Sequence, residues 1–134
     1  MKRALIAAAL SLSFLTLPAA MAEDGIKVQQ VHFKTGESNA SLQGKIAGRQ
    51  TLDYVLGAKA GQSMVVNLTG KSSTYFNVLP PKSEEAIFIG STLGNRFEGK
   101  LPANGQYRIR VYQMGAVEQF STPHSFKLDI GITN

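Results

Sequence analysis

Apolar residues recur at every second position along much of this chain, and this period constrains the fold more than any other feature. Met64, Val66 and Leu68 share one face of such a segment. Two other segments repeat the pattern, with Leu52, Tyr54, Leu56 and Ala58 in one and Phe126, Leu128, Ile130 and Ile132 in the other. Successive side chains of a β-strand point to opposite faces, so the pattern predicts strands that bury one face. No stretch offers the three turns of amphipathic helix that a crossover would need.

Gly, Pro, Asn and Ser punctuate these segments about every ten residues, as turns do in sandwiches and barrels. We expect strands near 27–34, 40–47, 50–58, 62–69, 74–79, 86–90, 95–101, 106–114 and 124–133. Pro80-Pro81 ends its strand, and the polar 81–85 loop that follows is expected to be exposed. The expected fold is all-β, a single-domain antiparallel β-sandwich of about eight strands.

Residues 1–22 read as a secretory signal peptide rather than as structure. Lys2 and Arg3 precede an apolar run, and Ala20-Met21-Ala22 is a small-x-small cleavage site. The run is too short to span a bilayer comfortably, so we expect cleavage after Ala22, export to the periplasm and no membrane insertion. Residues 23–134 then form one domain, 112 of the 134 residues.

Composition excludes several classes of function. The chain contains no cysteine, which removes thiol chemistry and cysteine-ligated metals. Without Lys2 and Arg3, twelve of its fourteen Lys and Arg remain against nine Asp and Glu, a net charge of about +3. These charges are scattered along the strands, which argues against a nucleic-acid partner.

The residues of catalysis do not form a recognisable set. His32 and His124 lie far apart without metal-ligand spacing, so we expect surface or structural roles and no metal. Residues 90–94 lack the Gly-x-Ser-x-Gly elbow and fit a hairpin loop between the 86–90 and 95–101 strands. Glu84-Glu85 reads as solvated loop charge. The sequence thus predicts no enzyme and no cofactor, and an exported domain that works by binding.

Residues 101–112 join a turn signal to the most regular alternation in the chain. Asn104-Gly105 readily takes positive φ at both positions, which predicts a type I′ hairpin turn. The strand beyond it places Tyr107, Ile109 and Val111 on one face, and Arg108, Arg110 and Tyr112 on the other.

Segments spread over the whole exported part carry a family resemblance, at 32–44, 53–62, 75–81, 87–91, 101–107 and 110–114. Together they resemble the periplasmic lysozyme inhibitors of Gram-negative bacteria. The inhibitors of invertebrate-type lysozyme look most similar, and the goose-type inhibitors come second.

The resemblance implies an antiparallel β-sandwich, often a homodimer, whose loops enter the lysozyme cleft and block its catalytic carboxylates, a means of evading host defence. Several inhibitor classes share a Ser-Gly-x-Tyr motif at the inhibitory loop, and the matching positions here are Asn104, Gly105, Gln106 and Tyr107. Asn104 departs from the motif: its amide can still donate to a carboxylate but is longer than a hydroxyl.

Other roles stay open for the residues near this loop. Tyr107 could buttress the turn or offer its hydroxyl, or pack inward as the alternation predicts. Arg108 and Arg110 could face an acidic cleft or form a solvated strand face, and Ser91 and Thr92 are further candidate contacts. A carbohydrate- or peptidoglycan-binding β-sandwich is the alternative function, because the segments before two strands also resemble jelly-roll modules of secreted peptidases.

Overall fold

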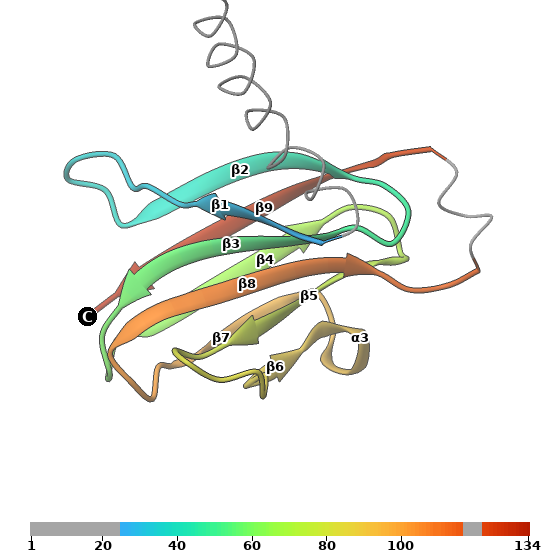
Figure 1. Cartoon of the computed structure of the whole chain (residues 1–134). Coiled ribbons are helices and arrows are strands. Elements are labelled where there is room, and N and C mark those ends of the chain that lie inside the picture. The colour runs from blue at the N-terminus through green and yellow to red at the C-terminus, as the bar shows by residue number, and fades with distance from the viewer. Residues whose placement is uncertain (1–24, 117–121) are drawn as a thin grey trace, which may run out of the picture.

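The computed structural model describes residues 25–116 and 122–134, which form a two-layered β-sandwich (Figure 1). The predicted signal peptide, residues 1–22, lies outside the described residues. Within the described residues no helix is long and apolar enough to cross a membrane.

One layer is a five-stranded sheet in the order β1-β3-β8-β5-β6. Its strands are β1 (Ile26–Gln30), β3 (Thr51–Ala58), β8 (Gly105–Gln113), β5 (Thr74–Leu79) and β6 (Phe88–Ile89). The other layer is a four-stranded sheet in the order β2-β9-β4-β7. Its strands are β2 (Asn39–Ile46), β9 (His124–Thr133), β4 (Ser63–Thr69) and β7 (Arg96–Lys100).

All the strand pairs are antiparallel except β1 with β3, which is parallel. The all-β sandwich predicted from the alternation is therefore confirmed, and its strands fall close to the predicted ranges. The parallel pairing of β1 was not predicted. Side chains alternate between the two faces in parallel and antiparallel strands alike, so the alternation does not show in which direction a strand runs.

The core lies between the two sheets and consists of the faces that the alternation selects. Met64, Val66 and Leu68 of β4 are buried, and so are alternate residues of β3, β8 and β9. Tyr54 and Phe126 meet edge to face across the layers, with ring centroids 6.2 Å apart. In the 86–90 segment Phe88 enters the core, whereas Ile87 and Ile89 are exposed.

The segment predicted as a hairpin over 86–101 instead crosses between the sheets. β6 pairs with β5 in the five-stranded sheet, and β7 pairs with β4 in the other. Between them the chain forms one helical turn, α3 (Gly90–Leu93), followed by Gly94 at φ 115°. The hairpin prediction is wrong at this point because alternation assigns faces to a strand but does not choose its neighbour.

Candidate functional site

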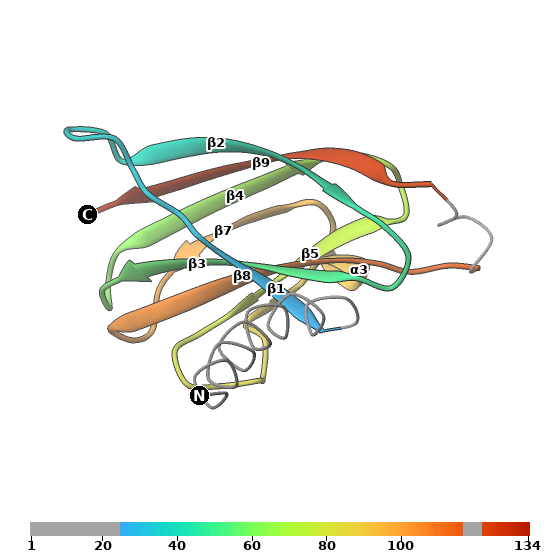
Figure 2. The same cartoon turned by 45° about the horizontal axis from the view of Figure 1, so that its top comes forward.

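The 101–107 turn connects β7 to β8 at one end of the sandwich, where β3 also ends and the C-terminus lies (Figure 2). The backbone N–H of Leu101 donates to the carbonyl of Gln62 at 2.8 Å, which extends the four-stranded sheet. Gly105 already pairs with Ala58 of β3 in the five-stranded sheet. The turn therefore carries the chain between sheets, and the hairpin predicted here is wrong.

The backbone of this turn also differs from the predicted type I′ geometry. Of the two central residues only Gly105 has a positive φ, 136°. The side chain of Asn104 is exposed, and its Oδ1 accepts a hydrogen bond from the backbone N–H of Ala60 at 2.7 Å. Since Oδ1 is engaged by the chain's own backbone, the Nδ2 group is the end of this side chain that can donate to a partner.

Tyr107 packs inward and supports the turn at the same time. Its side chain is fully buried. Its hydroxyl donates to the carbonyl oxygen of Ala103 at 2.7 Å and accepts from the N–H of the same residue at 3.1 Å. These bonds hold the turn from its buried side. Asn104, Gly105 and Gln106 are exposed at its tip.

Arg110 lies on the outer face of the five-stranded sheet and binds an acidic residue of β3. Its Nε and Nη2 donate to the two carboxylate oxygens of Asp53 at 2.8 and 3.0 Å. The Asp53 side chain is only 4% exposed. Hydrogen bonding to Asp53 is the main cause that raises the pKa of Arg110 above its ordinary value. Alternation did not predict the burial of Asp53, because it places this residue on the face of its strand that points away from the core.

Arg108 holds the 81–85 loop against the same face. Its Nη1 donates to Oε2 of Glu84 at 2.7 Å, and its Nη2 donates to the carbonyl oxygen of Ser83. Arg110 reaches the other Glu84 oxygen at 3.4 Å. The hydrogen bond and charge of Arg108 lower the pKa of Glu84, which favours its ionised form. The loop is thus fastened by ion pairs, and Arg108 and Arg110 are half-buried rather than a solvated face.

A hollow of about 840 Å³ is lined by residues of the 101–107 turn, the 81–85 loop and β1. Residues of all three elements and of the sheet floor line it: Val28, Asp53, Val55, Arg108 and segments 81–84 and 103–106. The exposed residues of the 101–107 turn therefore form one wall of a concave surface.

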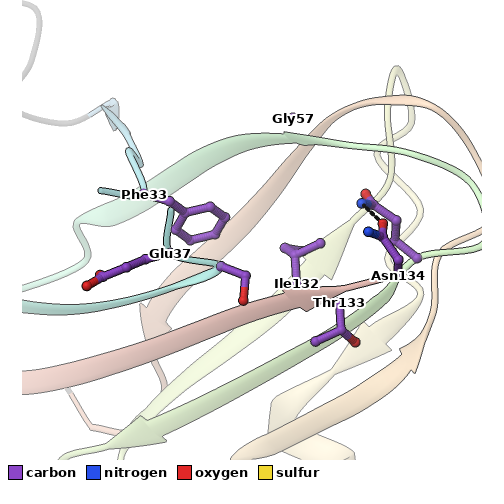
Figure 3. A pocket seen from close by; sticks show the side chains of 8 residues that line it. Phe33, Glu37, Gly57, Ile132, Thr133 and Asn134 are labelled. Carbon is purple, nitrogen blue, oxygen red and sulfur yellow. Dashed lines mark hydrogen bonds between the residues drawn. The ribbon is translucent and has the colours of Figure 1, made fainter. Parts of the chain in front are cut away.

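A second hollow, of about 470 Å³, opens at this end of the sandwich (Figure 3). The ring of Phe33 faces Ile132 across it. Gln62 closes one side, where its Nε2 donates to Oδ1 of Asn134 at 2.9 Å. No pattern in the sequence pointed to this hollow, since its lining comes from four separate segments.

Ser91 and Thr92 lie on α3, at the opposite end of β8 from the 101–107 turn (Figure 1). Both are exposed. The N–H of Ser91 donates to the hydroxyl of Tyr112 at 3.4 Å, and that hydroxyl donates to Oδ1 of Asn77 at 2.8 Å. The structure therefore does not bring these two residues to the predicted inhibitory loop.

The two histidines stay apart as well. His32 is exposed before β2, and His124 begins β9. Across residues 25–116 and 122–134, no three His, Asp or Glu side chains gather into a group that could hold a metal ion.

Comparison with known proteins identifies relatives over nearly the full exported length. The solved structure of Aeromonas hydrophila PliG, a periplasmic lysozyme inhibitor of g-type lysozyme, is 37% identical. The similarity covers 82% of this chain and 99% of that one, with a TM-score of 0.75. The chain belongs to the family of periplasmic inhibitors of g-type lysozyme. The Escherichia coli inhibitor of g-type lysozyme is 26% identical, with 93% of each chain covered.

No protein-family model matches the chain. The pre-peptidase C-terminal domain of a Bacillus anthracis collagenase, 12% identical with a TM-score of 0.54, covers 80% of this chain and 95% of its own. At that identity the likeness shows the shared sandwich fold alone.

Membership of the g-type inhibitor family settles several predictions. The lysozyme inhibitor resemblance is confirmed, and the chain is not an enzyme, since its relatives are inhibitors. Goose-type lysozyme, placed second from the sequence, is the enzyme that these relatives inhibit, and the invertebrate-type preference finds no support. The family is periplasmic, as the predicted export requires, whereas cleavage after Ala22 stays a prediction.

Proposed function

We propose that this chain inhibits g-type lysozyme in the periplasm by placing the 101–107 turn in the active-site cleft of the enzyme. The observation that carries the proposal is a rigid tip in a chain of this family. Asn104, Gly105 and Gln106 are exposed, while bonds from Tyr107 and Ala60 hold the backbone and the Asn104 side chain beneath them. A tip ordered before binding loses little conformational entropy in the complex.

The chemistry of the tip suits a glycoside hydrolase cleft. Such enzymes generally place a pair of carboxyl groups on either side of the bond that they cleave. The Nδ2 group of Asn104 can donate a hydrogen bond to an ionised carboxylate, and bonds to charged groups are stronger than neutral ones. The serine of the family motif could make the same donation, so Asn104 would keep the chemistry of that position with a longer reach.

The proposal leaves out Ser91 and Thr92, because a lysozyme bound at the tip would have to extend along all of β8 to reach them. Arg108 and Arg110 are engaged by carboxylates of their own chain. Inhibition of invertebrate-type lysozyme and formation of a homodimer stay predictions from the sequence resemblance.

Replacement of Asn104 by aspartate tests the donor role with little effect on the fold. The Asp side chain can still accept the hydrogen bond from the Ala60 N–H, but it presents an anion where the amide donated. We expect inhibition of g-type lysozyme, followed as lysis of a cell-wall suspension, to weaken at least about tenfold while thermal stability is unchanged.

Two further variants complete this test. Asn104→Ser restores the motif and should retain inhibition. Asn95→Asp makes the same charge change at an exposed asparagine beside α3 and should inhibit like the original chain. Full inhibition by Asn104→Asp would contradict the proposed contact. Sedimentation with insoluble peptidoglycan, without inhibition of any lysozyme, would support the carbohydrate-binding alternative instead.

A further inference from the structure

The 81–85 loop is long enough to extend into solvent, yet it lies on the outer face of the sheet beside the 101–107 turn. Three charged contacts hold it there: both Arg108 and Arg110 bind Glu84, and Arg108 also binds the backbone carbonyl of Ser83. Arg110 is itself fixed by the buried carboxylate of Asp53. Glu84 is the one side chain of the loop that takes part in these three contacts, and it is 75% exposed.

The anchored loop touches the turn directly. A methyl group added at Gly105 would lie 2.9 Å from the Cβ and Cγ atoms of Pro81, closer than carbon atoms approach without strain. The Pro81 ring thus packs against the backbone at the tip itself. The same two segments line the 840 Å³ hollow, so a displacement of the loop would change the surface beside the tip.

The backbone of the loop shows that it is held rather than relaxed. Lys82 is the only non-glycine residue with positive φ in the described residues, at 59°. This left-handed conformation is unfavourable for a residue with a side chain and persists where the surroundings impose it. Ser83, the next residue, and Glu84, one position further on, are the two residues that Arg108 binds, so the contacts act on the same stretch of backbone.

We propose that Glu84 is a positioning residue for inhibition: it fastens the 81–85 loop to Arg108 and Arg110, and the fastened loop holds the 101–107 turn in its binding conformation. This inference rests on the proposed function and adds to it a residue that need not touch lysozyme. Without the fastening, the loop and the tip would sample more conformations before binding, and the complex would pay for ordering them.

The variant Glu84→Gln removes the charge with little change in size, and Glu85→Gln is its matched control. Glu85 is the neighbouring carboxylate and is also exposed. Its backbone N–H donates to the Ser83 hydroxyl at 3.0 Å, whereas the two arginines bind Glu84. Both variants change the net charge by the same amount. Because the lost pairs are solvent-accessible, global stability should stay nearly the same in both.

Two measurements test whether Glu84 orders the loop and the turn. Amide hydrogen exchange by NMR on the free protein reports the order of residues 82–85 and 103–106 without any lysozyme. In Glu84→Gln we expect faster exchange in both segments and inhibition of g-type lysozyme weakened by about three- to tenfold. In the unmodified protein, 1 M salt should accelerate exchange in the same segments, and Glu84→Gln should have lost this salt sensitivity.

The outcomes separate this inference from the proposed function. Unchanged exchange at 103–106 in Glu84→Gln overturns the positioning role. Full inhibition by Glu84→Gln, together with the loss caused by Asn104→Asp, overturns it as well but leaves the tip in place. If neither variant weakens inhibition, the tip itself is wrong and the positioning role falls with it.

Discussion

At the residue scale, the electrostatic contacts of this protein divide into a buried and an exposed kind. Asp53 is almost inaccessible and receives two hydrogen bonds from the Arg110 guanidinium, a bidentate geometry that suits a carboxylate. The pair between Arg96 and Glu98 has a similar length, 2.9 Å, but both side chains are more than half exposed. By distance alone the two ion pairs would be expected to contribute equally to stability. Because only the Asp53–Arg110 pair is buried, the loss of one partner is costly there and not in the Arg96–Glu98 pair.

The substitution Asp53→Asn should lower the free energy of unfolding by about 2 kcal/mol, because it leaves the half-buried Arg110 without its main carboxylate. The substitution Glu98→Gln should change it by less than about 0.5 kcal/mol. Urea denaturation followed by circular dichroism measures both. Equal losses in the two variants would show that burial does not govern these pairs.

At the element scale, the passage between the sheets at α3 depends on one close approach of backbones. A methyl group at Gly90 would lie 2.3 Å from the carbonyl oxygen of Phe76, a main-chain atom that no side-chain rotation can move. Asn77 also accepts a hydrogen bond from the N–H of Gly90 at 3.1 Å. The helical turn is thus packed tightly on β5, which fixes where the chain leaves the five-stranded sheet.

We therefore expect Gly90→Ala to destabilise the protein by about 3 kcal/mol or more, since β5 or α3 must move. Gly57→Ala provides the matched control within a strand, because a methyl group there meets no atom within 4 Å. That change should be neutral or stabilising by about 0.5 kcal/mol. Midpoints of thermal unfolding compare the two, and a similar drop in both would contradict the close approach.

At the scale of the whole molecule, the sheets join segments that are distant in the chain. β3 pairs with β8, and β2 pairs with β9, so residues near 40 lie beside residues near 130. Both sheets share one core, which Tyr54 and Phe126 span. These distant segments must come together before most of the stabilising contacts can form, and the entropic cost of closing such long loops slows folding.

The protein should therefore unfold in one cooperative transition and refold in milliseconds to seconds rather than microseconds. The chain has no tryptophan, so fluorescence of its tyrosines, including the buried Tyr54 and Tyr107, reports the core directly. Stopped-flow fluorescence gives the rate. Separate transitions by tyrosine fluorescence and by far-ultraviolet circular dichroism would show that the two sheets unfold independently.

The candidate site could be predicted only in part. Residue type identified Asn104-Gly105 as a turn, and alternation correctly placed Tyr107 inward, where its hydroxyl supports the turn. Neither could show that Asn104 is bound to Ala60, which lies 44 positions earlier in the chain. Likewise Glu84 read as solvated charge, although it meets Arg108 and Arg110 in space.

The sequence by itself determined the strands and the faces that they bury, because a period of two and the spacing of turns are local properties. The family followed from the resemblance of segments along the chain to known lysozyme inhibitors. Only the tertiary structure decided which strands are neighbours. It therefore decided that residues 86–101 and 101–107 cross between sheets and that β1 runs parallel to β3. Alternation assigns each side chain to a face of the sheet but does not identify the strand that pairs with its own. The ion pair of Asp53 with Arg110, 57 positions apart, exists only once β3 and β8 lie side by side.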